Sequence, residues 1–178
     1  MKKAISVLLC FVMVIGVFCS TPMTVFAVET SPLSFYSNDD NTGWIVSLYD
    51  NSFDGALVIP ATLDDLPVLA IDDYAFDGGW YVTSISIPST VVSIGEGALD
   101  GCHSLKDIIV NEANEHFTSI KGVLYNKDVT ELITLPSGMT GSYVMPETVE
   151  SMILNPAACL QLSSITINSK IEEINLSG

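Results

Sequence analysis

Internal repetition is the feature of this 178-residue sequence that most restricts its fold. Short apolar segments that end in proline or asparagine recur, and the two uninterrupted intervals between their ends are 22 and 23 residues. A fixed period of about 20 to 50 residues predicts a solenoid, in which each repeat is one coil and buries its apolar face against its neighbours. The segments are Leu57–Pro60, Ile85–Pro88, Ile108–Asn111, Tyr143–Pro146 and Ile165–Asn168.

The longest interval, from Asn111 to Pro146, holds an insertion. Two apolar runs flank the turn residues 126–128, which predicts a hairpin over residues of about 120–136. Leu132–Leu135 resembles another repeat strand, but the next strand follows too soon for a parallel crossover, which needs about a dozen residues. We therefore assign Leu132–Leu135 to a hairpin arm and expect Tyr143–Met145 to stack directly on Ile108–Val110.

The repeat resembles a known family. The pattern Ile-x-Ile-Pro-x-x-Val-x-x-Ile-Gly-x-x-Ala-Leu-x-Gly-Cys-x-x-Leu over Ile85–Leu105 is similar to the BspA-like (treponemal-type) leucine-rich repeat. Asp64–Phe76 resembles the first repeat of that family, and Gly122–Asp128 its hairpin insertion, so that the resemblance covers residues of about 53–178. Asn155–Ala158 departs from the pattern. The resemblance implies a β-rich leucine-rich-repeat solenoid, with a parallel sheet on one side and short or irregular helical turns on the other.

The N-terminus is typical of an exported protein. Lys2 and Lys3 precede an uncharged apolar stretch, and Val25-Phe26-Ala27 forms a cleavage site, which together predict a signal peptide over residues 1–27. An uncleaved anchor is the alternative. We expect a flexible leader over 28–40, an N-terminal capping strand within 41–56 and repeats over 57–178 without a C-terminal cap. A longer parent protein, or end-on association with a second subunit, would cover that open end.

The negative net charge of the chain argues against two classes of partner. The chain has 21 acidic residues, six lysines and a formal net charge of −15. Binding to nucleic acid or to an anionic membrane needs clustered basic residues, so neither is expected once the signal peptide is removed.

Catalytic and metal-binding patterns are not found in the sequence. The acidic pairs, such as Asp64-Asp65, are adjacent residues that point to opposite faces of an extended chain, which does not suit glycoside hydrolysis. His103 and His116 accompany no nucleophile, metal or phosphate motif. Cys102 and Cys159 lie two coils apart, too far for a disulfide, and are expected as free thiols. We therefore predict a protein that is not an enzyme and has no cofactor or metal.

The exposed side of the strands is the candidate binding surface. Alternation along a strand points the first and third apolar residues inward and the middle residue outward. Outward residues of this type suit a ligand-binding face, or are simply good strand formers. The outward residues are Val58, Ser86, Ile109, Val144 and Thr166.

Two functions remain open from sequence. The resemblance implies a bacterial surface or secreted protein with an adhesion-type role, that is, a non-catalytic extracellular protein-interaction module. The alternative is a non-catalytic carbohydrate-targeting region of a larger exported enzyme, because exposed aromatic rings stack on sugars. The aromatic residues that motivate it are Trp44, Tyr74, Trp80 and Tyr81.

Overall fold

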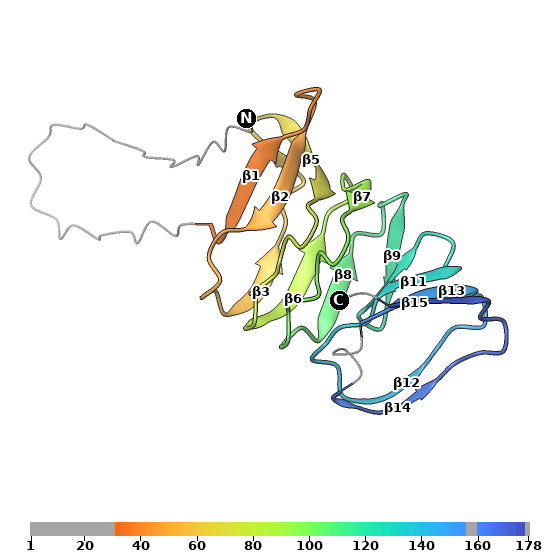
Figure 1. Ribbon diagram of the computed structural model, residues 1–178. Helices are drawn as coiled ribbons and strands as arrows, with labels where there is room; N and C mark the ends of the chain where they lie inside the picture. Colours follow the sequence, from red (N-terminus) through yellow and green to blue (C-terminus); the bar gives the residue numbers. More distant parts are fainter. Residues whose placement is uncertain (1–30, 156–159, 177–178) are drawn as a thin grey trace, which may run out of the picture.

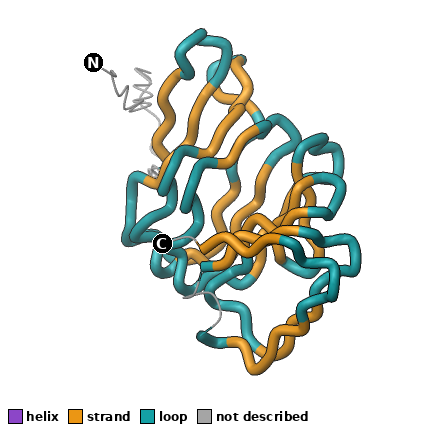
Figure 2. The backbone as a smooth tube through the Cα atoms, turned by 45° about the vertical axis from the view of Figure 1, so that its right-hand side comes forward, coloured by secondary structure: helices purple, strands orange, loops and turns teal. Residues whose placement is uncertain are grey.

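The computed structural model describes residues 31–155 and 160–176, which form a β-solenoid of 15 strands (Figure 1). This confirms the predicted fold class. In the described ranges the coils contain only strands and turns, so the expected helical turns are replaced by short strands and hydrogen-bonded turns (Figure 2). Accordingly, none of the residues described is part of a helix that could cross a membrane. The predicted signal peptide and Cys159 lie outside the described residues.

The strands are short, as expected for coils that turn every few residues. Their bounds are β1 Leu33–Ser37, β2 Trp44–Leu48, β3 Gly55–Val58, β4 Thr62–Leu63, β5 Leu66–Ile71, β6 Val82–Ile87, β7 Ser93–Ile94, β8 Asp107–Val110, β9 Phe117–Ile120, β10 Val123–Asn126, β11 Glu131–Thr134, β12 Gly141–Val144, β13 Ser151–Leu154, β14 Leu162–Thr166 and β15 Glu173–Leu176.

Two rows of parallel strands build the N-terminal half. One row is β3-β6-β8, in which successive coils are in register, and the other is β2-β5-β7 on the opposite side of the coils (Figure 1). Strand β1 pairs antiparallel with β2. The flexible leader expected over 28–40 is thus corrected at Leu33–Ser37, where a strand extends the sheet at its edge.

The insertion is a three-stranded antiparallel unit, β9-β10-β11, and Leu132 lies in its last strand, as predicted for a hairpin arm. The unit covers the free edge of β8. The amide N–H of Ile108 donates to the carbonyl oxygen of Gly122 at 3.0 Å, and the amide N–H of Val110 donates to Ser119 Oγ at 3.1 Å. On its other side, β11 pairs in parallel with β13, which pairs with β15.

The expected stacking of Tyr143–Met145 on Ile108–Val110 is wrong. Strand β12 pairs with β14 in a separate two-stranded sheet, while β8 pairs with β6. The reason is that the insertion already binds the amide groups of β8 that a following strand would need. The predicted continuous sheet is therefore split in two.

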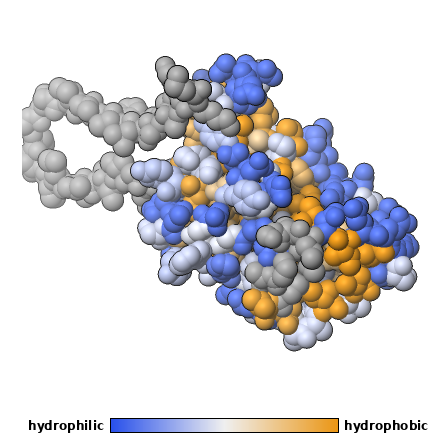
Figure 3. All heavy atoms as spheres, in the orientation of Figure 1, coloured by the Kyte–Doolittle hydropathy of each residue, from blue (hydrophilic) through white to orange (hydrophobic). Residues whose placement is uncertain are grey.

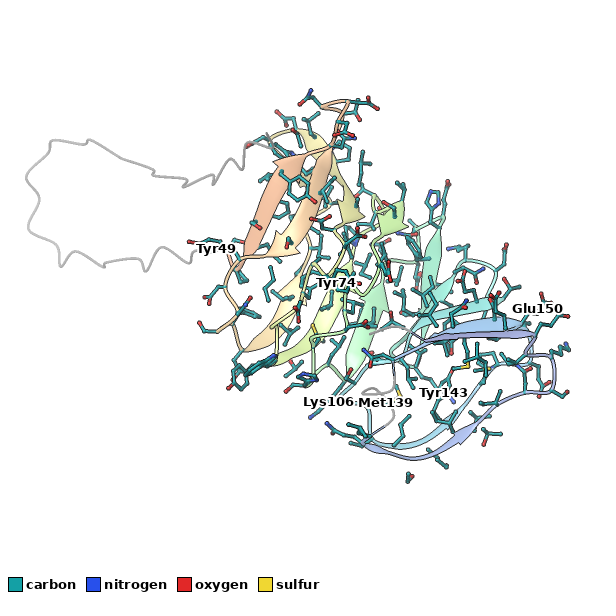
Figure 4. All side chains as sticks on the ribbon, in the orientation of Figure 1. Tyr49, Tyr74, Lys106, Met139, Tyr143 and Glu150 are labelled. Carbon is teal, nitrogen blue, oxygen red and sulfur yellow. The ribbon has the colours of Figure 1, made fainter. Side chains whose placement is uncertain are left out.

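The core is divided in the same way. The larger apolar cluster fills the coils up to β8 and includes Leu124 of the insertion. A second cluster, which includes Tyr143 and Met152, lies between β12-β14 and β11-β13-β15 (Figure 4). Ile167, which alternation predicts to point inward, is 46% exposed in the last described coil. On the face drawn in Figure 3, apolar atoms gather at this C-terminal end.

Two glycines allow successive coils to approach closely. A Cβ atom at Gly95 would lie 2.4 Å from the backbone nitrogen of Asp73, and one at Gly101 would lie 2.6 Å from the Cα atom of Asp77. Such distances are impossible for a side chain. The glycines of the Gly95-x-x-Ala98 and Gly101-Cys102 segments are thus required for coil stacking.

An asparagine side chain closes each of two turns. Asn114 Nδ2 donates to the carbonyl oxygens of Pro88 and Val91, both at 2.9 Å, and Asn168 Nδ2 donates to those of Pro146 and Val149. Asn114 is fully buried, and its Oδ1 accepts two amide protons, so all its hydrogen-bonding capacity is used. These asparagines donate to carbonyl oxygens of the Pro-x-x-Val turns and so fasten each turn to the coil that follows.

Candidate functional site: the exposed strand face

Three of the five predicted binding residues form one row on β3-β6-β8. Val58 is the register partner of Ser86, and Ser86 is the register partner of Ile109. Val58 is 68% exposed and Ile109 is 47% exposed, while their strand neighbours Leu57 and Ile108 are buried. Alternation along the strand therefore places the row on the outer face, as the sequence predicts.

The row encloses a shallow notch of about 210 Å³. The small side chain of Ser86 forms its floor, and the branched side chains of Val58 and Ile109 stand on either side. Pro88 and Asn111 close the end of the notch where the strands finish. A small side chain on the middle strand, between larger side chains on the two outer strands, thus makes a recess that would accept one apolar side chain.

An acidic residue lies beside the notch. Two residues before Ser86 and Ile109, a second outward row joins Ser84 to Asp107, and Asp107 is exposed. The apolar recess therefore has a carboxylate at one margin.

The two remaining predicted residues lie elsewhere. Val144 and Thr166 are register partners on β12 and β14, and Val144 is 67% exposed. They face solvent, as predicted, but they belong to the separate sheet. The structure thus brings Val58, Ser86 and Ile109 together and does not bring Val144 and Thr166 to them.

The aromatic residues proposed for sugar binding do not form one site. Trp44 is only 9% exposed, and its indole N–H donates to the carbonyl oxygen of Leu63 at 2.7 Å, so it is a core residue. The ring of Tyr74 lies against Gly97. Trp80 and Tyr81 are exposed, and the Trp80 ring is 6.5 Å from that of His103. Tyr74 and the exposed Tyr49 lie apart (Figure 4).

Reactive groups are few in the described part of the chain. Cys102 is a buried free cysteine, and burial, with a smaller effect from Asp100 and Asp77, raises the pKa of its thiol to about 12. Such a thiol is protonated and unreactive. Within residues 31–155 and 160–176, no cluster of three histidine, cysteine or acidic side chains has the geometry to hold a metal ion. His103 and His116 are both exposed.

Sequence reasoning missed one feature of this half of the molecule. Asp100 Oδ2 is buried and has no hydrogen-bond partner. In the sequence, Asp100 is one of many acids in turns, and nothing in the repeat pattern marks it.

These observations define the class: a β-solenoid whose coils present an exposed parallel strand face. Residues 69–177 match the BspA type leucine rich repeat region, in six copies. The chain belongs to this family, as the resemblance in its sequence indicated. No curated protein sequence is significantly similar to it.

Solved structures of bacterial proteins share the fold. The pneumococcal vaccine antigen PcpA has a TM-score of 0.60 and 25% identity over 71% of this chain, which spans 38% of that protein. A leucine-rich repeat protein from Eubacterium ventriosum has a TM-score of 0.51 and 18% identity, covering 82% of this chain and 60% of that one. The leucine rich repeat protein of T. pallidum has a TM-score of 0.50 and 18% identity over 81% and 83% of the two chains.

Proposed function

We propose that the chain is a non-catalytic protein-interaction module of a bacterial surface or secreted protein, with an adhesion-type role. The observation that carries the proposal is the notch formed by Val58, Ser86 and Ile109. Two large apolar side chains held exposed on a rigid sheet, around a small residue, form a recess of the kind that a partner's anchor residue fills. Membership of a repeat family supports this, because solenoids bind through extended faces.

The location rests on two further observations. The N-terminal sequence has the charge and apolar pattern of a signal peptide. The structural likeness to a pneumococcal protein described as a vaccine antigen, at 25% identity, also supports exposure outside the cell.

A matched pair of variants tests the binding face. Ile109→Lys and Val144→Lys place the same charge on equally branched, exposed strand positions of the two separate sheets. We expect binding on an array of purified extracellular-matrix proteins to be lost with Ile109→Lys and retained with Val144→Lys. Loss with Val144→Lys alone, or an unchanged signal with Ile109→Lys, would contradict the proposal.

Filling the notch provides a second test. Ser86→Trp places a large ring in the recess without adding charge, and the outward position of Ser86 leaves the core untouched. We expect the same loss of binding as with Ile109→Lys. Thr166→Trp, on the other sheet, is the matched control.

Carbohydrate targeting remains the second candidate, and one observation favours it. Trp80 and Tyr81 are exposed neighbours, and His103 of the next coil lies beside the Trp80 ring. A glycan array distinguishes the two functions. Sugar binding that Trp80→Ala abolishes and Ile109→Lys leaves intact would support the carbohydrate alternative.

A further inference from the structure

We draw no further inference here: the strongest candidate, the hollow of about 300 Å³ between the turn at residues 94–100 and the sheet β11-β13-β15, carries none because nothing in the structure shows what would occupy it.

Discussion

The hydroxyl groups of Tyr125 and Tyr143 are hydrogen-bonded to each other inside the second core. Tyr125 lies on β10 of the insertion, and Tyr143 lies on β12 of the two-stranded sheet. The pair therefore links the insertion, which covers the edge of the β3-β6-β8 row, to β12, the first strand of the β12-β14 sheet. Both side chains are buried, so each hydroxyl depends on the other for a partner.

Removing one hydroxyl should destabilise the fold. Tyr143→Phe leaves the Tyr125 hydroxyl buried without its partner, and we expect the free energy of unfolding to fall by about 1 to 3 kcal/mol. Urea denaturation measures this, with the exposed Tyr81→Phe as control. The double variant with Tyr125→Phe should recover part of the loss, because no unpaired group remains; an additive loss would contradict the pairing.

High pH should destabilise the protein through the same pair. Burial raises the pKa of both tyrosines above the ordinary value of 10.0, so they stay protonated in the folded state while the unfolded chain ionises. Stability is then fully present below pH of about 10 and is lost as the pH rises above it. Denaturation midpoints measured across this range should fall more steeply for the unchanged chain than for the double phenylalanine variant. Equal slopes would contradict this assignment.

Asn114 should contribute more to stability than its neighbour Asn111. Asn114→Ala leaves two carbonyls and two amides of the turn without partners, and we expect a loss of about 2 to 4 kcal/mol. Asn111→Ala is the matched control, because Asn111 is exposed and accepts one amide proton, from Ala113. Equal stability of the two variants would show that the buried amide does not hold the turn.

Gly101 should not tolerate a side chain. Gly101→Ala would force a methyl group into the backbone of Asp77 and Gly78, and we expect a loss of about 3 kcal/mol. Gly141→Ala separates this clash from backbone strain, because Gly141 has a φ of +86° but open space around it. That variant should lose only about 1 kcal/mol. The thermal midpoints of the two variants check the order, and the reverse order would contradict close coil stacking.

Cys102 should be inert in the folded protein. Because burial raises the pKa of its thiol to about 12, Ellman's reagent at about pH 8 should not modify it until the chain unfolds. Ile109→Cys, on the exposed strand face, should add one thiol that reacts at once. Immediate modification of Cys102 in the folded chain, mapped by mass spectrometry, would contradict its burial.

The sequence was sufficient for whatever depends on local periodicity. The spacing of Leu57, Ile85 and Ile108 predicts coils, inward side chains and the outward row, because alternation and period act within one coil. It was insufficient where backbone groups of distant segments compete. The amide N–H of Ile108 can donate either to the insertion or to the strand that contains Tyr143. Which of the two it bonds to depends on which segment the fold places beside it, and no side-chain pattern encodes this.

The same distinction applies to the candidate sites. The notch residues were identified because they follow strand alternation. The hollow lined by Asp100 and Ile153 could not be, since its two walls come from segments far apart in the sequence that only the fold places opposite each other.

Cysteine cross-linking tests the division of the strand face most directly, because the binding surface proposed here depends on it. In a chain whose native cysteines are replaced by alanine, the pairs Ser86→Cys with Ile109→Cys and Val144→Cys with Thr166→Cys occupy register partners within a sheet. Both should form disulfides under mild oxidation, since adjacent strands lie within bonding range. The pair Ile109→Cys with Val144→Cys should not. Rapid disulfide formation between positions 109 and 144 would show one continuous ladder and contradict the account.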